Sequence, residues 1–175
     1  KFQAFGDLRP IRQDPINIHD VLTQVKRVAK AGYASNIKFV EDYDPSLPFV
    51  RGDGELLFQV IQNLLKNAAE ATPENGGQIT LATTFKQGMR VAVGQKTSEA
   101  LPLHVAIIDN GPGVPESIKE EVFEPFVTSK MNGSGLGLSF VSKVITDHGG
   151  AVEYNRSNGR SKFILMLPRS YKELN

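Results

Sequence analysis

The sequence predicts an α/β sandwich, in which one mixed and mainly antiparallel sheet carries helices on one face. Three observations predict this class. Segments with apolar residues at helical spacing and segments of strand composition both occur. The two kinds do not alternate strictly, which argues against an all-parallel sheet. The length of 175 residues suits one domain that buries its own core, and the absence of cysteine excludes disulfides.

The N-terminal half begins with an arm and continues with two helices and a strand. Residues 1–15 show little periodicity and contain prolines, as is typical of a linker. The pattern from Asn17 to Lys30 predicts a helix that starts at an Asn cap and ends at Gly32. Ile37 to Tyr43 is expected to be a strand. Asp53 to Thr72 is the strongest helix pattern, capped by its Asp and stopped by the next proline.

The C-terminal half supplies the rest of the sheet. Gln78 to Phe85 is rich in β-branched residues and predicts a strand, and residues 88–99 indicate a loose hairpin. Leu103 to Ile108 is almost wholly apolar, so we expect this strand to be buried on both faces.

Glycine and proline punctuate the chain beyond residue 108. Residues 109–134 predict a long loop with one short helical piece, Glu116 to Val122. Gly135 to His148 predicts the last long helix. Ala151 to Arg156 and Ser161 to Leu167 predict a terminal hairpin.

Charge and composition exclude several functions. The formal net charge is +1, so no strong field is available for binding nucleic acid or a membrane surface. No apolar run approaches the roughly 20 residues of a membrane span. We expect a cytoplasmic domain with no nucleic-acid or membrane contact. The chain does not begin with Met, and we expect it to be a piece of a longer protein.

The glycines gather in two clusters. The first, Asp109 to Gly113, follows the apolar strand and places an acid before a flexible loop. The second, Gly133 to Leu138, opens the last helix, where free N–H groups and the helix dipole attract phosphate. On these two clusters alone, simple tight turns explain the pattern equally well.

Two further features carry polar groups. Asn63 and Asn67 share one face of a helix that is largely apolar and expected to be buried, and their oxygens suit Mg²⁺ that also binds phosphates. Taken alone, a purely structural pair of amides is the favoured interpretation. The segment Phe123 to Lys130 lies inside the long loop, and its phenylalanines and lysine are typical of a lid.

These four features occur in the order of the N, G1, F and G2 boxes of the histidine-kinase catalytic domain, and the chain from about residue 16 resembles that family (HATPase_c, or GHKL). The boxes correspond to residues 62–68, 109–113, 123–126 and 133–138, and residues 148–150 and 163–168 are also similar. Thr128 to Lys130 and the run 67–71 most resemble the nitrogen-regulation kinases of NtrB type. The resemblance implies a Bergerat-type ATP-binding fold with a flexible lid.

The resemblance also implies roles for individual residues. Asp109 is expected to accept a hydrogen bond from the adenine amino group, beside a loop that Gly111 and Gly113 allow to turn. Asn67 is expected to ligate Mg²⁺, with Asn63 next to it. The residues whose backbone is expected to bind the phosphates are Ser134, Gly135, Leu136 and Gly137. The expected catalytic residues are Asn63 and Lys130, and Ser161 is a weaker candidate near the adenine.

Two departures from the family pattern stand out. Many members carry a basic residue where this chain has Glu70, which leaves that role to Lys130 or Lys66. The phospho-acceptor box is missing, and His19 does not begin one. The acceptor histidine is therefore expected on a helical dimerisation domain that precedes residues 1–15, with residues 16–170 forming the catalytic domain, the lid at about 111–134 and a tail at 171–175.

The resulting hypothesis is a kinase that transfers the γ-phosphate of Mg-ATP to that histidine, in two-component signalling with a response regulator and a PII signal protein as partners. One alternative is an ATPase resembling gyrase, Hsp90 or MutL, but those relatives place a Glu base where this chain has Asn63, and an amide cannot take a proton at neutral pH. The other alternative is a non-catalytic module that binds nucleotide to recruit a partner.

Overall fold

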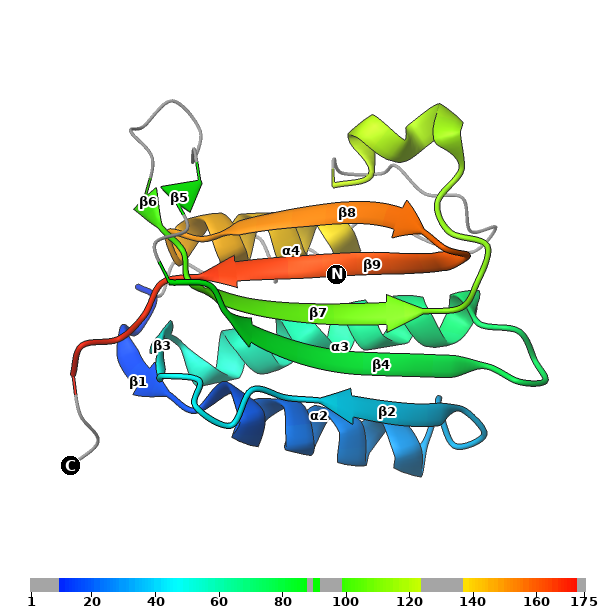
Figure 1. Ribbon diagram of the computed structural model, residues 1–175, viewed down its shortest axis with the longest axis horizontal. Coiled ribbons are helices and arrows are strands. Elements are labelled where there is room, and N and C mark those ends of the chain that lie inside the picture. The colour runs from blue at the N-terminus through cyan, green and yellow to red at the C-terminus, as the bar shows by residue number, and fades with distance from the viewer. Residues whose placement is uncertain (1–9, 88–89, 92–98, 124–136, 173–175) are drawn as a thin grey trace.

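The computed structural model describes residues 10–87, 90–91, 99–123 and 137–172. Its centre is a sheet in the order β2-β4-β7-β9-β8, in which β2 and β4 are parallel and the other neighbours antiparallel. Three helices, α2, α3 and α4, lie together behind the sheet (Figure 1). The strands are β2 Lys38–Asp42, β4 Gln78–Phe85, β7 Leu103–Asp109, β8 Ala151–Ser157 and β9 Arg160–Leu167. The predicted α/β sandwich with a mixed sheet is confirmed.

The three long helices start and end close to the predicted residues. They are α2 Ile18–Ala31, α3 Gly54–Ala71 and α4 Gly137–Asp147. Both predicted N-caps are confirmed, because the side chain of Asn17 accepts the N–H of His19 and that of Asp53 accepts the N–H of Leu56. Each of these bonds satisfies a donor that the first turn of a helix leaves without an intrahelical partner.

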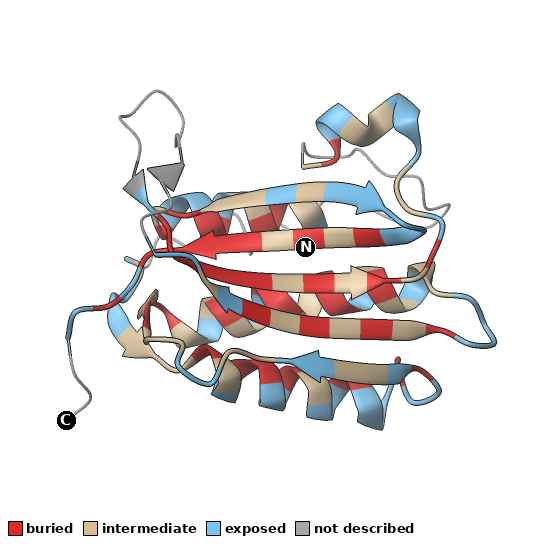
Figure 2. Ribbon diagram, viewed as in Figure 1, coloured by how far each residue is buried: buried red, intermediate tan, exposed pale blue. Residues whose placement is uncertain are grey.

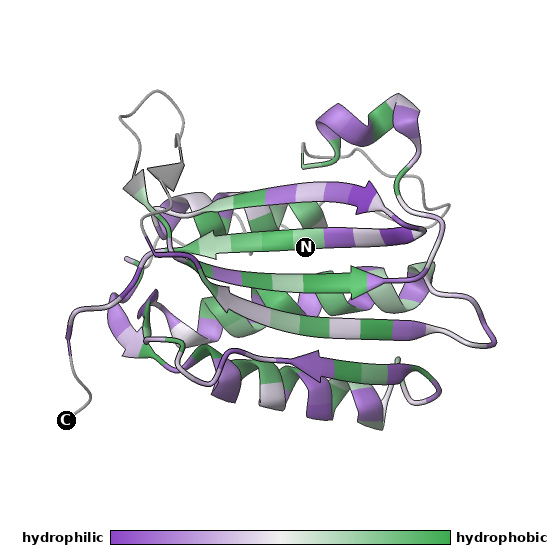
Figure 3. Ribbon diagram, viewed as in Figure 1, coloured by the Kyte–Doolittle hydropathy of each residue, from purple (hydrophilic) through white to green (hydrophobic). Residues whose placement is uncertain are grey.

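The hydrophobic core lies between the helices and the inner face of the sheet. Figure 2 shows buried residues alternating with less buried ones along β4 and β7, as a sheet covered on one face requires. Figure 3 shows that the apolar residues concentrate in β7 and in the half of β9 nearer its end. Fully buried core residues include Leu57, Ile61, Leu64, Leu65, Leu81, Val105, Ile107 and Leu165.

Strand β7 is buried on both faces only near its start, where His104 on the outer face is buried, and toward its end that expectation was wrong. Leu103, Val105 and Ile107 point to the helices and are fully buried, whereas Ala106 and Ile108 on the other face are partly exposed. The reason is that α2, α3 and α4 all cover the same face, so apolar residues on the outer face have no helix to pack against.

Short elements were harder to predict than long ones. The arm contains a strand that its composition hides: β1 Asp14–Ile16 pairs antiparallel with β3 Val50–Gly52. Strands of this length carry no periodicity to detect. The loose hairpin forms from β5 Arg90–Val91 and β6 Glu99–Ala100, and the short helical piece forms as the 3-10 helix η1 Glu116–Glu121.

A two-residue turn joins β8 to β9. Asn158 and Gly159 have φ values of 53° and 71°, in the left-handed region that Asn and Gly tolerate best. Ser157 pairs with Arg160 on either side of the turn, which sets the register of the whole hairpin.

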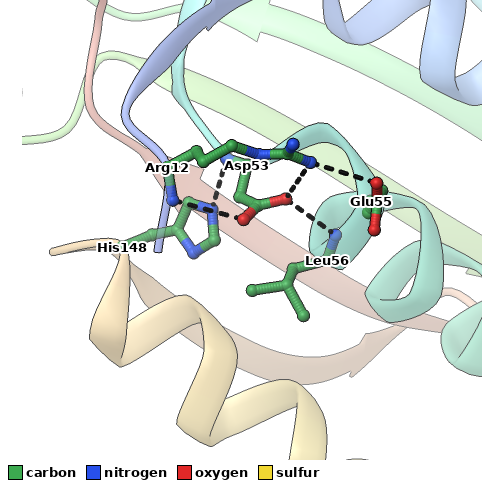
Figure 4. A network of polar contacts seen from close by, with 5 residues as sticks. All are labelled: Arg12, Asp53, Glu55, Leu56 and His148. Atoms are coloured by element: carbon green, nitrogen blue, oxygen red, sulfur yellow. Dashed lines mark hydrogen bonds and ion pairs between the residues drawn. The ribbon is translucent and has the colours of Figure 1, made fainter. Parts of the chain in front are cut away.

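A polar network joins the arm to the start of α3 (Figure 4). The backbone N–H of Arg12 donates to Asp53 Oδ2 at 3.2 Å, and its guanidinium Nη2 lies 3.4 Å from Asp53 Oδ1 and 3.2 Å from Glu55. Asp53 is fully buried and also caps the helix through Leu56. One carboxylate therefore fixes both the entering chain and the first turn of α3.

His148 completes this junction as a neutral side chain. Its Nε2 lies 3.0 Å from the backbone N–H of Asp53 and must accept that bond, while Nδ1 lies 2.8 Å from the carbonyl of Val144 and must donate. Burial lowers the pKa of His148. Only the neutral ring can accept the N–H of Asp53, so this contact requires His148 to be uncharged.

Candidate functional site at the end of β7

The loop that follows β7 lies against the end of α3. A Cβ placed on Gly111 would collide with the carbonyl oxygen of Ala71, so only glycine fits there. Ala71 is one helical turn beyond Asn67. The structure therefore brings two of the predicted segments together, the Asn63 and Asn67 segment of α3 and the Asp109 to Gly113 loop.

The start of α4 lies alongside the same stretch of α3. The two helices run antiparallel (Figure 1), and His148, just after the end of α4, contacts Asp53 at the beginning of α3. α4 has 11 residues, so its first residue lies about 16 Å from that contact. The same distance along α3 leads to the neighbourhood of Asn63 and Asn67. Gly137 is the first described residue of α4, and a Cβ on it would meet no atom of the described residues within 4 Å.

Asn63 and Asn67 lie at the edge of the buried stripe of α3 and are half-buried, not fully buried as the sequence suggested. Their neighbours Val60 and Leu64 are fully buried. An amide at such an edge can reach a ligand at the surface without the full cost of burying a polar group. Glu70 and Lys66 are exposed.

Asp109 is the last residue of β7 and is only 3% exposed. Its Oδ1 accepts the backbone N–H of Gly111 at 2.9 Å, and it pairs with Ser161 across the β7–β9 ladder. Burial raises the pKa of Asp109, while the hydrogen bond from Gly111 and the nearby charge of Arg156 oppose that rise. The predicted adenine acceptor and the weaker candidate Ser161 are thus direct neighbours.

Asn110 ties the loop to the beginning of β4, a role that sequence reasoning missed. Its Oδ1 accepts the N–H of Gln78 at 3.0 Å, and its Nδ2 donates to the carbonyl of Gly76 at 2.9 Å. The side chain of Asn110 therefore faces the β4 side of the loop.

Position 113 requires glycine for two reasons, its backbone conformation and the close approach of neighbouring side chains. Its φ is +84°, and a Cβ there would lie 2.7 Å from Tyr154 Oη and 2.8 Å from Ser161 Oγ. The loop consequently passes close to the β8–β9 hairpin.

Two residues of that hairpin, Tyr154 and Arg156, were also missed. Nη1 of Arg156 donates to the carbonyl of Gly111 at 2.8 Å and to Ser161 Oγ at 2.9 Å. Tyr154 Oη accepts the N–H of Val114 at 2.8 Å and donates to Ser161 Oγ at 3.3 Å. Both lie on β8 outside the recognised motifs, and the only signal available was the hairpin register, which places Arg156 opposite Ser161.

Phe123, the first residue of the predicted lid motif, packs on the core. Its ring meets that of Phe163 edge to face, with 5.9 Å between centroids. The other lid residues Glu124, Pro125 and Phe126 lie outside the described residues. So do the predicted site residues Lys130, Ser134, Gly135 and Leu136.

Comparison with known proteins identifies the family to which this fold belongs. Residues 52–171 match the family of histidine kinase-, DNA gyrase B- and HSP90-like ATPases. The full-length kinase ShkA in complex with AMPPNP is similar with a TM-score of 0.75 and 25% identity, covering 96% of this chain and 33% of that one. The catalytic domain of histidine kinase ThkA has a TM-score of 0.73 and 30% identity, covering 90% and 96%.

The chain belongs to this ATPase family, and within it to the ATP-binding catalytic domains of histidine kinases. Among curated proteins it is similar to the sensory histidine kinase/phosphatase NtrB of Azospirillum brasilense, with 47% identity over 169 residues that cover 96% of this chain and 42% of that protein. ThkA in complex with the response regulator TrrA is also similar, with a TM-score of 0.72 and 27% identity over 91% of this chain and 42% of that one. The predicted resemblance to NtrB is confirmed.

The chain spans less than half the length of the curated NtrB relatives that it matches. In the part of the chain that the structure describes, no helix is long and apolar enough to cross a membrane.

Proposed function

We propose that this chain is the ATP-binding half of a sensor kinase of nitrogen regulation, and that it presents the γ-phosphate of Mg-ATP to a histidine on a separate dimerisation domain. The observation that carries the proposal is the convergence of three segments. We call the amides of α3, the Asp109 loop and Gly137 at the described start of α4 the cradle; the contact of Gly111 with Ala71 and the antiparallel α3–α4 pair support their grouping.

The adenine end of the cradle is assigned to Asp109. A buried carboxylate is a strong acceptor for the amino group of the base, and Oδ1 is already aligned by Gly111. Gly111 and Gly113 allow the backbone to pass close to the base, and Ser161 lies beside it.

The phosphate end is assigned to Asn67, Asn63 and the start of α4. Asn67 would hold Mg²⁺ through its amide oxygen with Asn63 next to it, since half-buried amides fit a cation that keeps waters and takes phosphate ligands. When bound, Mg²⁺ neutralises phosphate charge. The backbone N–H of Gly137 and the positive end of the α4 dipole would also stabilise the negative charge of the phosphates. Lys130 is assigned to the terminal phosphates.

The reaction requires positioning more than proton transfer. A ring nitrogen of the acceptor histidine forms a bond to the γ-phosphorus as the bond from that phosphorus to the ADP oxygen breaks, and ADP leaves. A neutral imidazole is already a nucleophile. Asn63 has an amide where a water-activating base would stand, so the cradle favours transfer over hydrolysis.

Transfer from labelled ATP to a separately supplied acceptor domain of an NtrB-type kinase tests the proposal. We expect label on the acceptor histidine, lost when that histidine is replaced by Gln. Nucleotide binding without transfer would favour a non-catalytic module. Steady ATP hydrolysis at ordinary enzymatic rates by the chain alone would favour the ATPase alternative.

The proposed partners follow from the same assignment. They are the dimerisation domain with the acceptor histidine, a response regulator that receives the phosphate, and a PII signal protein docking on this domain. The complex of ThkA with TrrA supports the second of these. A cytoplasmic location is part of the proposal.

A further inference from the structure

We propose that Arg156 and Tyr154 are positioning residues that hold the loop Asp109 to Val114 in the shape that binds adenine. The inference rests on the proposed adenine site at Asp109. It concerns the hairpin side of that site, which the recognised motifs do not include.

The loop is held from three sides. Asn110 fixes it to the β4 side, and Gly111 rests on the carbonyl of Ala71 at the end of α3. The third side is the hairpin, where Arg156 binds the Gly111 carbonyl and Tyr154 binds the Val114 N–H. The hairpin contacts are made by side chains alone, so substitution can remove them without removing a strand.

These contacts control the acceptor itself. Gly111 donates its N–H to Asp109 Oδ1, and its carbonyl accepts from Arg156, so one peptide segment connects the guanidinium to the adenine-binding carboxylate. If Gly111 shifts, the carboxylate loses the bond that orients it. Because a hydrogen bond weakens steeply with misalignment, a small shift is enough to reduce binding of the base.

Ser161 links the two positioning residues. Its Oγ accepts from both Arg156 and Tyr154, and Ser161 pairs with Asp109 across the ladder. Burial raises the pKa of Asp109, and the positive charge of Arg156 opposes that rise, which favours the ionised acceptor. The hydrogen bonds of Arg156 and its charge therefore both favour Asp109 as an acceptor for adenine.

Tyr154→Phe and three variants of Arg156 separate these contributions. Arg156 is exposed, and the Tyr154 ring keeps its contact with Phe163 in the Phe variant, so we expect all of them to fold. Arg156→Ala removes both the charge and the hydrogen bonds, Arg156→Gln keeps only a donor, and Arg156→Lys keeps the charge and a shorter donor. The matched control is Arg160→Ala, an exposed arginine on the same hairpin.

The measurement is calorimetric affinity for ATP and for adenosine, with thermal unfolding as the folding control. We expect Arg156→Ala and Tyr154→Phe to weaken both ligands by the same factor, about 3- to 10-fold, because each loses hydrogen bonds on the base side. Arg156→Lys should restore part of the loss, and Arg160→Ala should bind like the unmodified chain.

Phosphoryl transfer gives a second readout. At saturating ATP the rate should be unchanged while KM rises by the same factor, since the base and not the phosphates is displaced. Unchanged affinity in Arg156→Ala, or a loss for ATP much larger than for adenosine, would overturn the inference. Failure of the unmodified chain to bind ATP would instead overturn the proposed function.

Discussion

Asp109 is the residue on which nucleotide selectivity is expected to depend. Asp109→Asn replaces a charged acceptor with an amide whose NH₂ can face the adenine amino group, so ATP affinity should fall about 10- to 100-fold. Burial raises the pKa of Asp109, so the variant also relieves the cost of a buried charge and should unfold no more easily than the unmodified chain. Calorimetric titration with ATP checks the first expectation and urea unfolding the second. The control is Asp147→Asn on exposed α4 surface, and equal affinities in the two variants would show that adenine binds elsewhere.

Asn67 is expected to bind Mg²⁺ and not to contact the adenine base. Asn67→Ala should reduce ATP binding in the presence of Mg²⁺ at least tenfold and leave adenosine binding within about twofold, because the amide oxygen that would hold Mg²⁺ is lost. Titrations of both ligands with Mg²⁺ and with EDTA check this. An equal loss of both ligands would point to a folding defect.

Residues of the site differ in how well sequence alone could identify them. Asp109 and Gly111 belong to a short segment in which acid, glycine and the end of an apolar strand occur together, and that combination is local. Arg156 and Tyr154 carry no local signal, since their function comes from Ser161 and Gly111, which are distant along the chain or lie on another strand. Side chains that act through tertiary pairing are beyond single-sequence reasoning.

At the scale of elements, α4 makes a sharp test of the phosphate end. A Cβ on Gly137 meets no atom of the part of the chain that the structure describes within 4 Å. Alanine favours a helix by up to about 1 kcal/mol over glycine, so Gly137→Ala should fold at least as stably as the unmodified chain. If the phosphates approach the backbone there, ATP affinity should nevertheless fall about tenfold while adenosine affinity stays constant. Calorimetry with both ligands checks this. Unchanged ATP affinity would place the phosphates away from the first residue of α4.

Long elements were predictable and short ones were not. α3 has a cap, a sustained apolar stripe and a proline after it, so its bounds follow from local chemistry. β1 and β3 are too short for periodicity, and they pair beside the contact between Arg12 of the arm and Asp53, which local sequence does not reveal. The partial exposure of Ile108 could not be predicted, because hydrophobicity alone does not reveal which face of the sheet the helices will cover.

The whole domain should lose stability in mild acid. Burial lowers the pKa of all three histidines, His19, His104 and His148, so each stays neutral in the folded state at a pH where its unfolded form takes up a proton near pH 6.5. The unfolded state then binds more protons, and the free energy of unfolding falls as pH drops below about 6.5, by up to about 1.4 kcal/mol per pH unit for each histidine.

Urea unfolding at pH 7.5 and 5.5 measures this loss. In His148→Gln the loss should be smaller, because one of the three protonation steps is gone, although its stability at pH 7.5 should fall as the bonds to Asp53 and Val144 are disturbed. An identical pH dependence in the variant and the unmodified chain would show that His148 is not among the responsible groups.

The turn at Asn158 and Gly159 has a consequence for how this domain tolerates change. Tyr154 and Arg156 reach the nucleotide loop only because they are two residues apart on one face of β8, and that face is chosen by the register that the turn imposes. If insertion or deletion of a single residue there shifts the pairing by one residue, both side chains turn to the opposite face although neither is replaced. Selectivity for the base therefore depends on the length of a surface turn as well as on the residues that line the site.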